Sequence, residues 1–402
     1  MYDFAALFRF ELKKLTGKKI LWVSALMCLL GISLSVTSSL LGTYYVNGEP
    51  VETHYQMFQV DRAYREALSG RAIDTQLLQE TAEAYACIPT GTEFYTVSEE
   101  YQTYARPYSD IFNLIRSWTG MELEEIQNWE PEEEALYGAR MALLERDWTS
   151  IPLTEGEQAF WRSRETELSL PLTYRYHEGY ETALNIVSTI GVLMLLFVSV
   201  CLSNTFSQEH TRRTDQLILS STGGKTAAYW AKLLAGIAVA LAGSTGMALL
   251  SMGLSLGIFG WEGFETPFQI YGRFYSLPLT MGGACLIAYG LLILTSILAA
   301  VFVMVLSEWL RSGTAALAVS TALVILGGMV NIPSQYRVAA QVWDWLPMTY
   351  LTSWNIFDAR TLPLFGRYFL SWQAVPFLYV LCAAALALGG KRIYQHCQIS
   401  GR

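Results

Sequence analysis

Long stretches without charged side chains place the strongest constraint on how this chain can fold. Windows free of Asp, Glu, Lys and Arg lie within 20–50, 182–208, 233–261, 274–307, 312–336 and 368–390. A helix needs about 20 apolar residues to cross a bilayer. Charged residues make up 15% of the chain, compared with roughly 25% in soluble domains. The pattern predicts an all-α polytopic membrane protein with six transmembrane helices.

The windows and the polar stretches between them divide the chain into segments. We predict transmembrane helices at 20–42, 181–207, 226–258, 277–306, 313–331 and 368–390. The other segments are an amphipathic interfacial helix at 1–19, an extracellular and mostly helical domain at 43–180, a cytoplasmic loop at 208–225, outer interfacial or re-entrant helices at 332–367, and a cytoplasmic tail at 391–402.

The distribution of basic residues predicts the orientation in the membrane. In a six-helix arrangement every lysine and six of the arginines outside 49–181 flank the same side of the bundle. The positive-inside bias makes that side cytoplasmic and places both termini there. The large loop carries 26 acidic residues and 10 arginines, a balance of −16, which leaves +8 for the rest of the chain. Long loops cross a membrane largely regardless of charge, so this loop does not oppose the assignment.

Residues 1–19 have the pattern of a helix that lies along a membrane surface. Phe4, Leu7, Phe8 and Leu12 recur at helical spacing, and basic residues occupy other parts of the circumference. We interpret these four residues as an interfacial anchor. The alternative is the basic start of a signal peptide. The apolar run that follows exceeds the 7–15 residues of such a peptide, and no clear Ala-x-Ala site follows it.

The domain at 43–180 shows mainly helical signals. Thr119 with Glu122, and Thr154 with Glu157, have the spacing of a capping box. Further helices are expected at 56–68, 74–86 and 131–148, and strand evidence is thin. Acidic residues concentrate at 122–134. Two interpretations are open: they occupy the solvated first turns of helices, or they attract a cationic ligand or a divalent ion.

Several kinds of chemistry have no support in the sequence. The six cysteines and four histidines are spread along the chain without Cys-x-x-Cys spacing, so no metal site is expected. Gly224-Lys225-Thr226 resembles the end of a phosphate-binding loop, but Leu219 occupies the position of the required first glycine. No catalytic motif is present either. We expect a protein that is not an enzyme, binds no cofactor directly and has no nucleic-acid partner.

The predicted spans are rich in small residues and carry no charge near their centres. Gly236, Gly243 and Gly246 in the third span allow close helix packing, in a bundle or a dimer. The absence of central charges argues against a proton relay. The stretch 332–367 is highly aromatic, typical either of helices at the headgroup level or of a packed extracellular cap.

The polar stretch between the second and third spans predicts a short amphipathic helix that Gly223-Gly224 ends. With a glutamate, a Thr-x-x-Leu-Leu-x-Ser-type run and two following lysines, the chain resembles permease subunits of ABC-2 type exporters, specifically a subset with a large loop after the first span. The residues that carry this resemblance are Glu209, Thr214, Leu217, Ile218, Leu219, Ser220, Ser221, Lys225 and Lys232.

The resemblance implies a coupling helix that docks on a separate ATPase. Its residues would be Glu209, Arg212, Arg213, Thr214, Asp215, Leu217, Ile218, Leu219, Ser220 and Ser221. The partners it implies are two copies of an ABC ATP-binding subunit, which would hold ATP and Mg, and a second permease, identical or different, in a dimer. Glu209 and Arg213 also have the spacing of a solvated ion pair.

The leading functional hypothesis is an export permease for an amphiphile, either an antimicrobial peptide or a lipid-like molecule, in a bacterial plasma membrane. The alternative is a membrane sensor whose extracellular domain binds a ligand and signals without transport. A polytopic membrane enzyme is disfavoured because no catalytic constellation is present.

Overall fold

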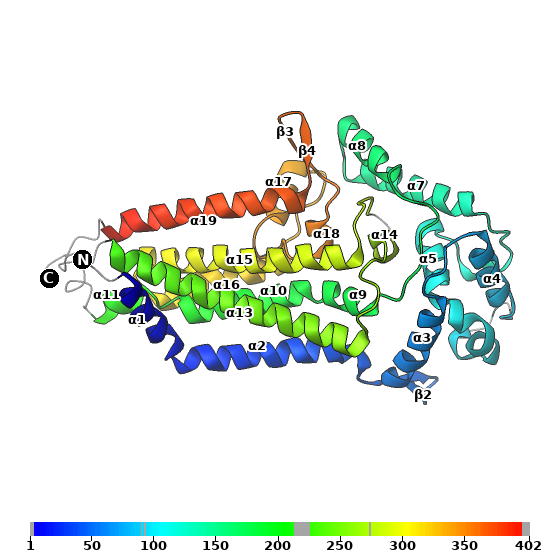
Figure 1. Ribbon diagram of the computed structural model, residues 1–402, viewed down its shortest axis with the longest axis horizontal. Helices are drawn as coiled ribbons and strands as arrows, with labels where there is room; N and C mark the ends of the chain where they lie inside the picture. Colours follow the sequence, from blue (N-terminus) through cyan, green and yellow to red (C-terminus); the bar gives the residue numbers. More distant parts are fainter. Residues whose placement is uncertain (1–3, 90, 92–93, 213–225, 273–274, 396–402) are drawn as a thin grey trace. The chain divides into compact units, whose positions relative to one another are not determined.

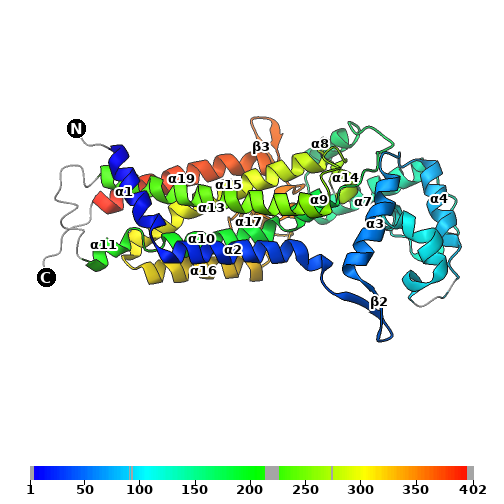
Figure 2. The ribbon, with the colours of Figure 1, turned by 60° about the horizontal axis from the view of Figure 1, so that its bottom comes forward.

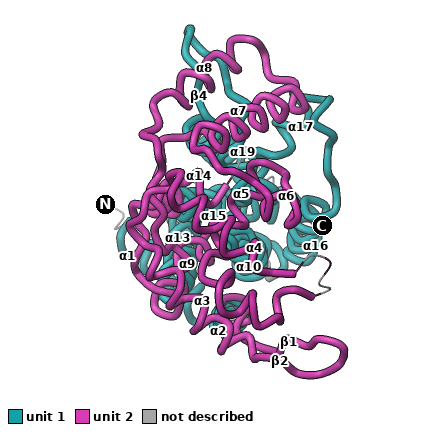
Figure 3. Tube along the Cα trace, turned by 90° about the vertical axis from the view of Figure 1, so that its right-hand side faces the viewer, with its two compact units in different colours: residues 1–34, 185–254, 287–402 teal, residues 35–184, 255–286 magenta. Residues whose placement is uncertain are grey.

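The computed structural model describes residues 4–89, 91, 94–212, 226–272 and 275–395. The chain forms two compact units, coloured separately in Figure 3. Unit 1 comprises 1–34, 185–254 and 287–402, and unit 2 comprises 35–184 and 255–286. The division cuts through three long helices, so each unit contains parts of them.

Unit 1 is a bundle of long apolar helices, which run alongside one another in Figures 1 and 2. Its elements, including helices that continue into unit 2, are α1 (Phe4–Thr16), α2 (Lys19–Thr37), α10 (Val187–Leu202), α11 (Ser207–Arg212), α13 (Ala227–Phe259), α15 (Met281–Leu310), α16 (Gly313–Met329), α17 (Arg337–Asp344), α18 (Ser353–Ile356), strands β3 (Leu362–Leu364) and β4 (Arg367–Phe369), and α19 (Ser371–Gln395).

Five helical segments in the described residues are long and apolar enough to cross a membrane: Lys19–Leu40, Val187–Thr211, Ala227–Phe259, Met281–Leu310 and Ser371–Gln395. The remaining expected span, at 313–331, corresponds to α16, which is apolar but has 17 residues. At 1.5 Å per residue it rises about 26 Å, the lower limit for a spanning helix. It ends before Pro333, which cannot continue a helix.

Close contacts and hydrogen bonds hold α13 against its neighbours. A Cβ atom on Gly243 would lie 2.6 Å from the Phe197 ring of α10, so the two helices need a glycine there. Towards α15, Ser244 Oγ lies 2.9 Å from Ser296 Oγ, and Ser251 Oγ lies 2.7 Å from the Tyr289 hydroxyl. These polar pairs are buried, and hydrogen bonds of this kind contribute to helix association in membranes.

The segment between α16 and α19 contains short helices, as the sequence indicates, and also the antiparallel hairpin β3–β4, which the sequence does not. Arg360 is buried between Asp358 and Asp344, at N–O distances of 2.6 and 2.5 Å. The Tyr379 hydroxyl of α19 donates a hydrogen bond to the carbonyl oxygen of Trp345, 2.8 Å away. These contacts show that the segment is packed, while its place relative to the membrane stays a prediction.

Unit 2 is mostly helical. It contains the hairpin β1 (Thr43–Val46) and β2 (Glu49–Thr53), followed by α3 (His54–Leu68), α4 (Thr75–Ala86), the short turns η2 (Tyr95–Val97), η3 (Tyr101–Ala105) and η4 (Arg106–Tyr108), α5 (Ser109–Thr119), α6 (Leu123–Gln127), α7 (Glu133–Ser150), α8 (Glu155–Glu165), α9 (Glu178–Asn185) and α14 (Phe268–Tyr271). Its core is formed mainly by α4 and α5, with Tyr85 stacked on Phe112 at 3.8 Å between ring centroids.

Local capping explains where several of these helices begin. The Thr154–Glu157 capping box is confirmed at the start of α8. The Thr119–Glu122 prediction is wrong, because Thr119 is the last residue of α5, and Gly120 in the left-handed conformation ends that helix. Glu122 instead caps α6 together with Glu125.

Unit 2 extends beyond the domain expected at 43–180, because 255–286 belongs to it. Arg140 of α7 shows one reason: this buried side chain pairs with Glu165 at 2.9 Å and donates a hydrogen bond to the carbonyl oxygen of Tyr275, 2.9 Å away. Its guanidinium also lies 4.9 Å from the Trp118 ring centroid. The polar segment after α13 therefore satisfies a buried charge in unit 2.

Candidate functional site

The polar stretch after α10 begins with the short helix α11, which is anchored by buried groups. The Ser207 amide donates to Ser307 Oγ of α15, 3.3 Å away, and the preceding residue, Phe206, is almost completely buried. The Phe206 ring lies 5.7 Å from that of Tyr394 in α19. In Figures 1 and 2, α11 is at the same end of unit 1 as α1.

Glu209 is the central residue of this end of the bundle. It is 6% exposed, and its carboxylate forms ion pairs with Lys14 of α1, at 3.5 Å, and with Lys232 of α13. Lys232 is 1% exposed and lies over the rings of Phe206 and Tyr394, 5.5 and 5.7 Å from their centroids. A buried ammonium group needs such compensation, because leaving it unpaired costs several kcal/mol. One carboxylate thus ties α11 to two helices.

A hydrogen-bonding contact between side chains joins α11 to α15. His210 Nε2 lies 3.0 Å from Glu308 Oε2, and Glu308 is 2% exposed. Lys14 also lies 3.5 Å from Glu11 within α1. We call this group of side chains from four helices the α11 charge cluster: Glu11, Lys14, Glu209, His210, Lys232 and Glu308.

A polar pocket lies beside the cluster. It has a volume of about 330 Å³ and is lined by Lys18, Asn204, Gln208 and Thr211. The described part of the chain contains no group of three or more His, Cys, Asp or Glu residues that could hold a metal ion.

The structure places only part of the sequence-predicted coupling helix. Glu209 and Arg212 belong to α11, whereas Arg213, Thr214, Asp215, Leu217, Ile218, Leu219, Ser220 and Ser221 lie outside the described residues. The charged face of this helix was expected to meet a partner. Within the chain, the Glu209 carboxylate pairs with Lys14 and Lys232, and docking of this helix on a partner stays a prediction.

The predicted interfacial anchor is part of α1. Phe4 is 40% exposed, while Leu7, Phe8 and Leu12 are half-buried. The buried residues of this helix are Glu11 and Leu15. α1 therefore contacts the bundle through one face that includes a charged member of the cluster.

Only Glu209 of the cluster is among the site residues predicted from the sequence, which did not include Glu11, Lys14, His210, Lys232 or Glu308. Lys232 entered the sequence analysis only through the family resemblance. Glu308 and His210 both follow directly on apolar stretches that end on the same predicted side of the bundle. Charged residues next to spans on one side are the signal that could have brought them together.

The fold and the cluster define a class, a multi-pass membrane protein with a large additional unit and a charged, buried junction at one end of its bundle. The family model described as ABC-2 family transporter protein matches residues 20–389. The chain belongs to this family, whose members act as transporter permeases and pair with an ABC ATP-binding subunit. No curated protein matches the sequence.

Proposed function

We propose that this chain is the permease subunit of an ATP-driven exporter that moves an amphiphilic substrate, either an antimicrobial peptide or a lipid-like molecule. ATP and Mg would be bound by a separate ATP-binding subunit, present in two copies, and a second permease would complete the transporter. The absence of charged residues from the middle of the apolar windows supports an apolar or amphiphilic cargo.

The observation that carries the proposal is the junction at Glu209. A partner that displaces 208–225 displaces α11, and the ion pairs of Glu209 pass this force to α13, through the buried Lys232, and to α1, through the partly exposed Lys14. The His210–Glu308 contact passes it to α15. Packed helices joined in this way respond by rigid-body movement rather than by local deformation. The basic residues on this side support a cytoplasmic location, where an ATPase can dock.

The test is to co-express the chain with a candidate ABC ATP-binding subunit and to purify the complex. The chain alone should hydrolyse no ATP, and the complex should hydrolyse ATP and move a fluorescent amphiphile in proteoliposomes. Leu217→Ala and Asp215→Asn should uncouple hydrolysis from transport, because both change the segment expected to meet the ATPase. Glu122→Gln, on an exposed side chain of unit 2, is the matched control.

Two results would contradict the proposal. One is wild-type coupled transport in both variants. The other is modification of Lys225 by a membrane-impermeant reagent added to intact cells, which would place the coupling segment on the wrong side.

A further inference from the structure

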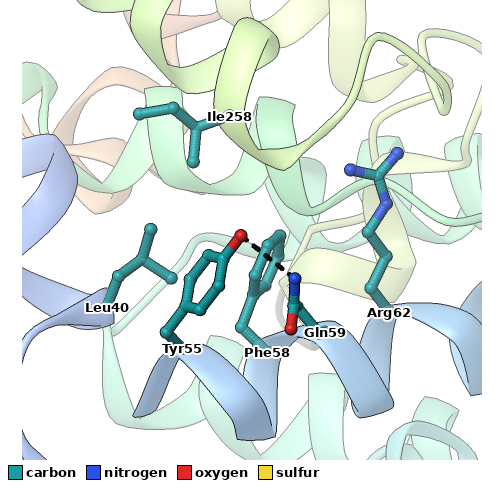
Figure 4. A pocket seen from close by; sticks show the side chains of 6 residues that line it. All are labelled: Leu40, Tyr55, Phe58, Gln59, Arg62 and Ile258. Carbon is teal, nitrogen blue, oxygen red and sulfur yellow. Dashed lines mark hydrogen bonds between the residues drawn. The ribbon is translucent and has the colours of Figure 1, made fainter. Parts of the chain in front are cut away.

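Unit 2 contains a pocket formed where two apolar helical segments end. It has a volume of about 610 Å³ and is lined by Leu40, Tyr55, Phe58, Gln59, Arg62 and Ile258 (Figure 4). Leu40 is the last residue of the apolar segment Lys19–Leu40, and Ile258 is next to the last residue of Ala227–Phe259. The ends of membrane-crossing segments lie at the depth of lipid headgroups, so lipid is the ligand available at this position.

The walls of the pocket suit a hydrocarbon chain. Tyr55, Phe58, Gln59 and Arg62 fall on one face of α3, and Figure 4 shows them leaving the helix on the side where Ile258 lies. Phe58 is fixed by an edge-to-face contact with Phe259, 5.2 Å between centroids. Aliphatic and aromatic side chains with a few polar groups, in a volume within about 300–1,000 Å³, are typical of small-molecule sites.

The polar end of the pocket presents hydrogen-bond donors. Arg62 Nε is bonded to Glu66 at 2.6 Å, while the terminal nitrogens of this guanidinium have no hydrogen bond to any other residue that the structure describes. The Tyr55 hydroxyl accepts from Gln59 Nε2 at 3.0 Å, which leaves its own proton free to donate. A guanidinium with two open nitrogens is the side chain that best binds a phosphate.

Negative charge lies next to these donors. The position that a Cβ atom would take on Gly260 lies 2.6 Å from Glu262 Oε2 and 3.6 Å from Arg62 Nη2. The carboxylate and the guanidinium therefore face the same small space beside this glycine. Glu262 is exposed, and Glu66 is 45% exposed at its side chain. A ligand that carries only negative charge would meet these carboxylates, whereas one with both signs would complement them.

We propose that this pocket binds a zwitterionic phospholipid, with its phosphate on Arg62, its ammonium group near Glu262 and an acyl chain between Leu40, Phe58 and Ile258. Binding does not depend on the proposed export function; only the question whether the bound lipid is also cargo rests on it.

The experiment is native mass spectrometry of the full-length protein in detergent, titrated with three lipids of identical acyl chains. Phosphatidylethanolamine carries both charges, phosphatidylglycerol lacks the ammonium group, and diacylglycerol lacks the headgroup. We expect one tightly bound phosphatidylethanolamine per chain and weaker binding of the other two. Arg62→Gln should reduce phosphatidylethanolamine affinity about 10- to 100-fold, because it removes charge-assisted hydrogen bonds to the phosphate.

Further variants separate the two ends of the lipid. Glu262→Gln should lower the affinity for phosphatidylethanolamine several-fold and raise that for phosphatidylglycerol, because it removes a negative charge that opposes the anionic headgroup. Ile258→Trp should fill the pocket and weaken all three lipids. The Arg62 guanidinium lies 5.6 Å from the Tyr176 ring centroid and pairs with Glu66. The control for Arg62→Gln is Arg116→Gln, because Arg116 likewise pairs with a glutamate, at 2.7 Å, and lies 5.9 Å from the Phe112 ring centroid, yet lines no part of the pocket. Val51→Trp, on an exposed strand position, controls for the added indole.

The proposal is overturned if Arg62→Gln and Ile258→Trp bind phosphatidylethanolamine as the wild type does, or if Arg116→Gln lowers binding equally. It is also overturned if phosphatidylglycerol binds as tightly as phosphatidylethanolamine, or if millimolar inorganic phosphate alone displaces the lipid. Loss of the lipid site with an ATPase still co-purifying would refute the pocket and leave the permease function intact. Lipid binding to a chain that recovers no ATPase partner would support the pocket and refute the permease function.

Discussion

Neutralising Glu209 tests whether the α11 charge cluster stabilises the bundle. In Glu209→Gln the ammonium of Lys232 stays buried without its carboxylate, and breaking a buried pair by removing one partner costs about 3–5 kcal/mol. Lys14 should contribute much less, because its side chain is 30% exposed and retains Glu11, and partly exposed pairs contribute about 0–1 kcal/mol. Most of the cost of Glu209→Gln should therefore come from Lys232, because Lys14 keeps Glu11 as a partner in that variant.

A double variant separates the charge from the packing. Replacing both partners, in Glu209→Gln with Lys232→Met, removes the uncompensated ammonium group. It should recover most of the stability that the single change loses. The free energy of unfolding can be measured by reversible SDS titration of the purified protein in mixed micelles. Glu122→Gln breaks a 2.7 Å pair of similar geometry that is exposed, and it serves as the control.

Two results would refute this reasoning. The first is a Glu209→Gln cost no larger than that of Glu122→Gln. The second is a double variant as unstable as the single one, because then the loss would come from the geometry of the carboxylate and not from an unpaired buried charge.

Three other predictions follow from contacts described above. Gly243→Ala should destabilise the bundle by about 1–3 kcal/mol in the same SDS titration, because its Cβ would lie 2.6 Å from the Phe197 ring. Gly246→Ala should be neutral, because no atom lies within 4 Å of its Cβ position. Equal effects of the two changes would contradict close packing at Gly243. Thr154→Ala should lower the thermal stability of unit 2 by about 1 kcal/mol through loss of the α8 cap, and an unchanged melting temperature would argue against the cap. Burial raises the pKa of Asp358 from 3.8 to about 6, so protonation of this carboxyl favours the folded state. The stabilisation is fully present below about pH 4 and is lost as pH rises through 6. Between these values the free energy of unfolding should fall by at most about 1.4 kcal/mol per pH unit. Asp358→Asn should remove that slope, and an unchanged pH profile would show that another group causes it.

The apolar helices were predictable because composition alone determines them. A stretch of 20 or more residues without charge can satisfy its backbone only as a helix when it crosses a bilayer. The window within 182–208 accordingly contains α10, and those within 233–261 and 368–390 form most of α13 and α19. The α8 cap was predictable for a similar reason, because Thr154 and Glu157 lie in one helical turn.

Contacts between distant segments were not predictable in the same way. Nothing local shows that Glu209 pairs with Lys14, 195 residues away by their numbers, or that Tyr275 receives a hydrogen bond from Arg140. Such pairs depend on which helices lie together, which one sequence does not specify. The β1–β2 hairpin is different, because Asn47-Gly48 between short β-prone runs is a strong local signal for a two-residue turn that was available and not used.

The paired hydroxyl groups between α13 and α15 have a mechanical consequence. Two hydrogen bonds cross the interface between these helices about two helical turns apart, one between Ser244 and Ser296 and one between Ser251 and Tyr289. Two such points resist sliding as well as rotation of one rod past the other. If unit 1 changes shape during a transport cycle, α13 and α15 would move together as one rigid body. The hinge would then lie between other pairs of helices in the bundle.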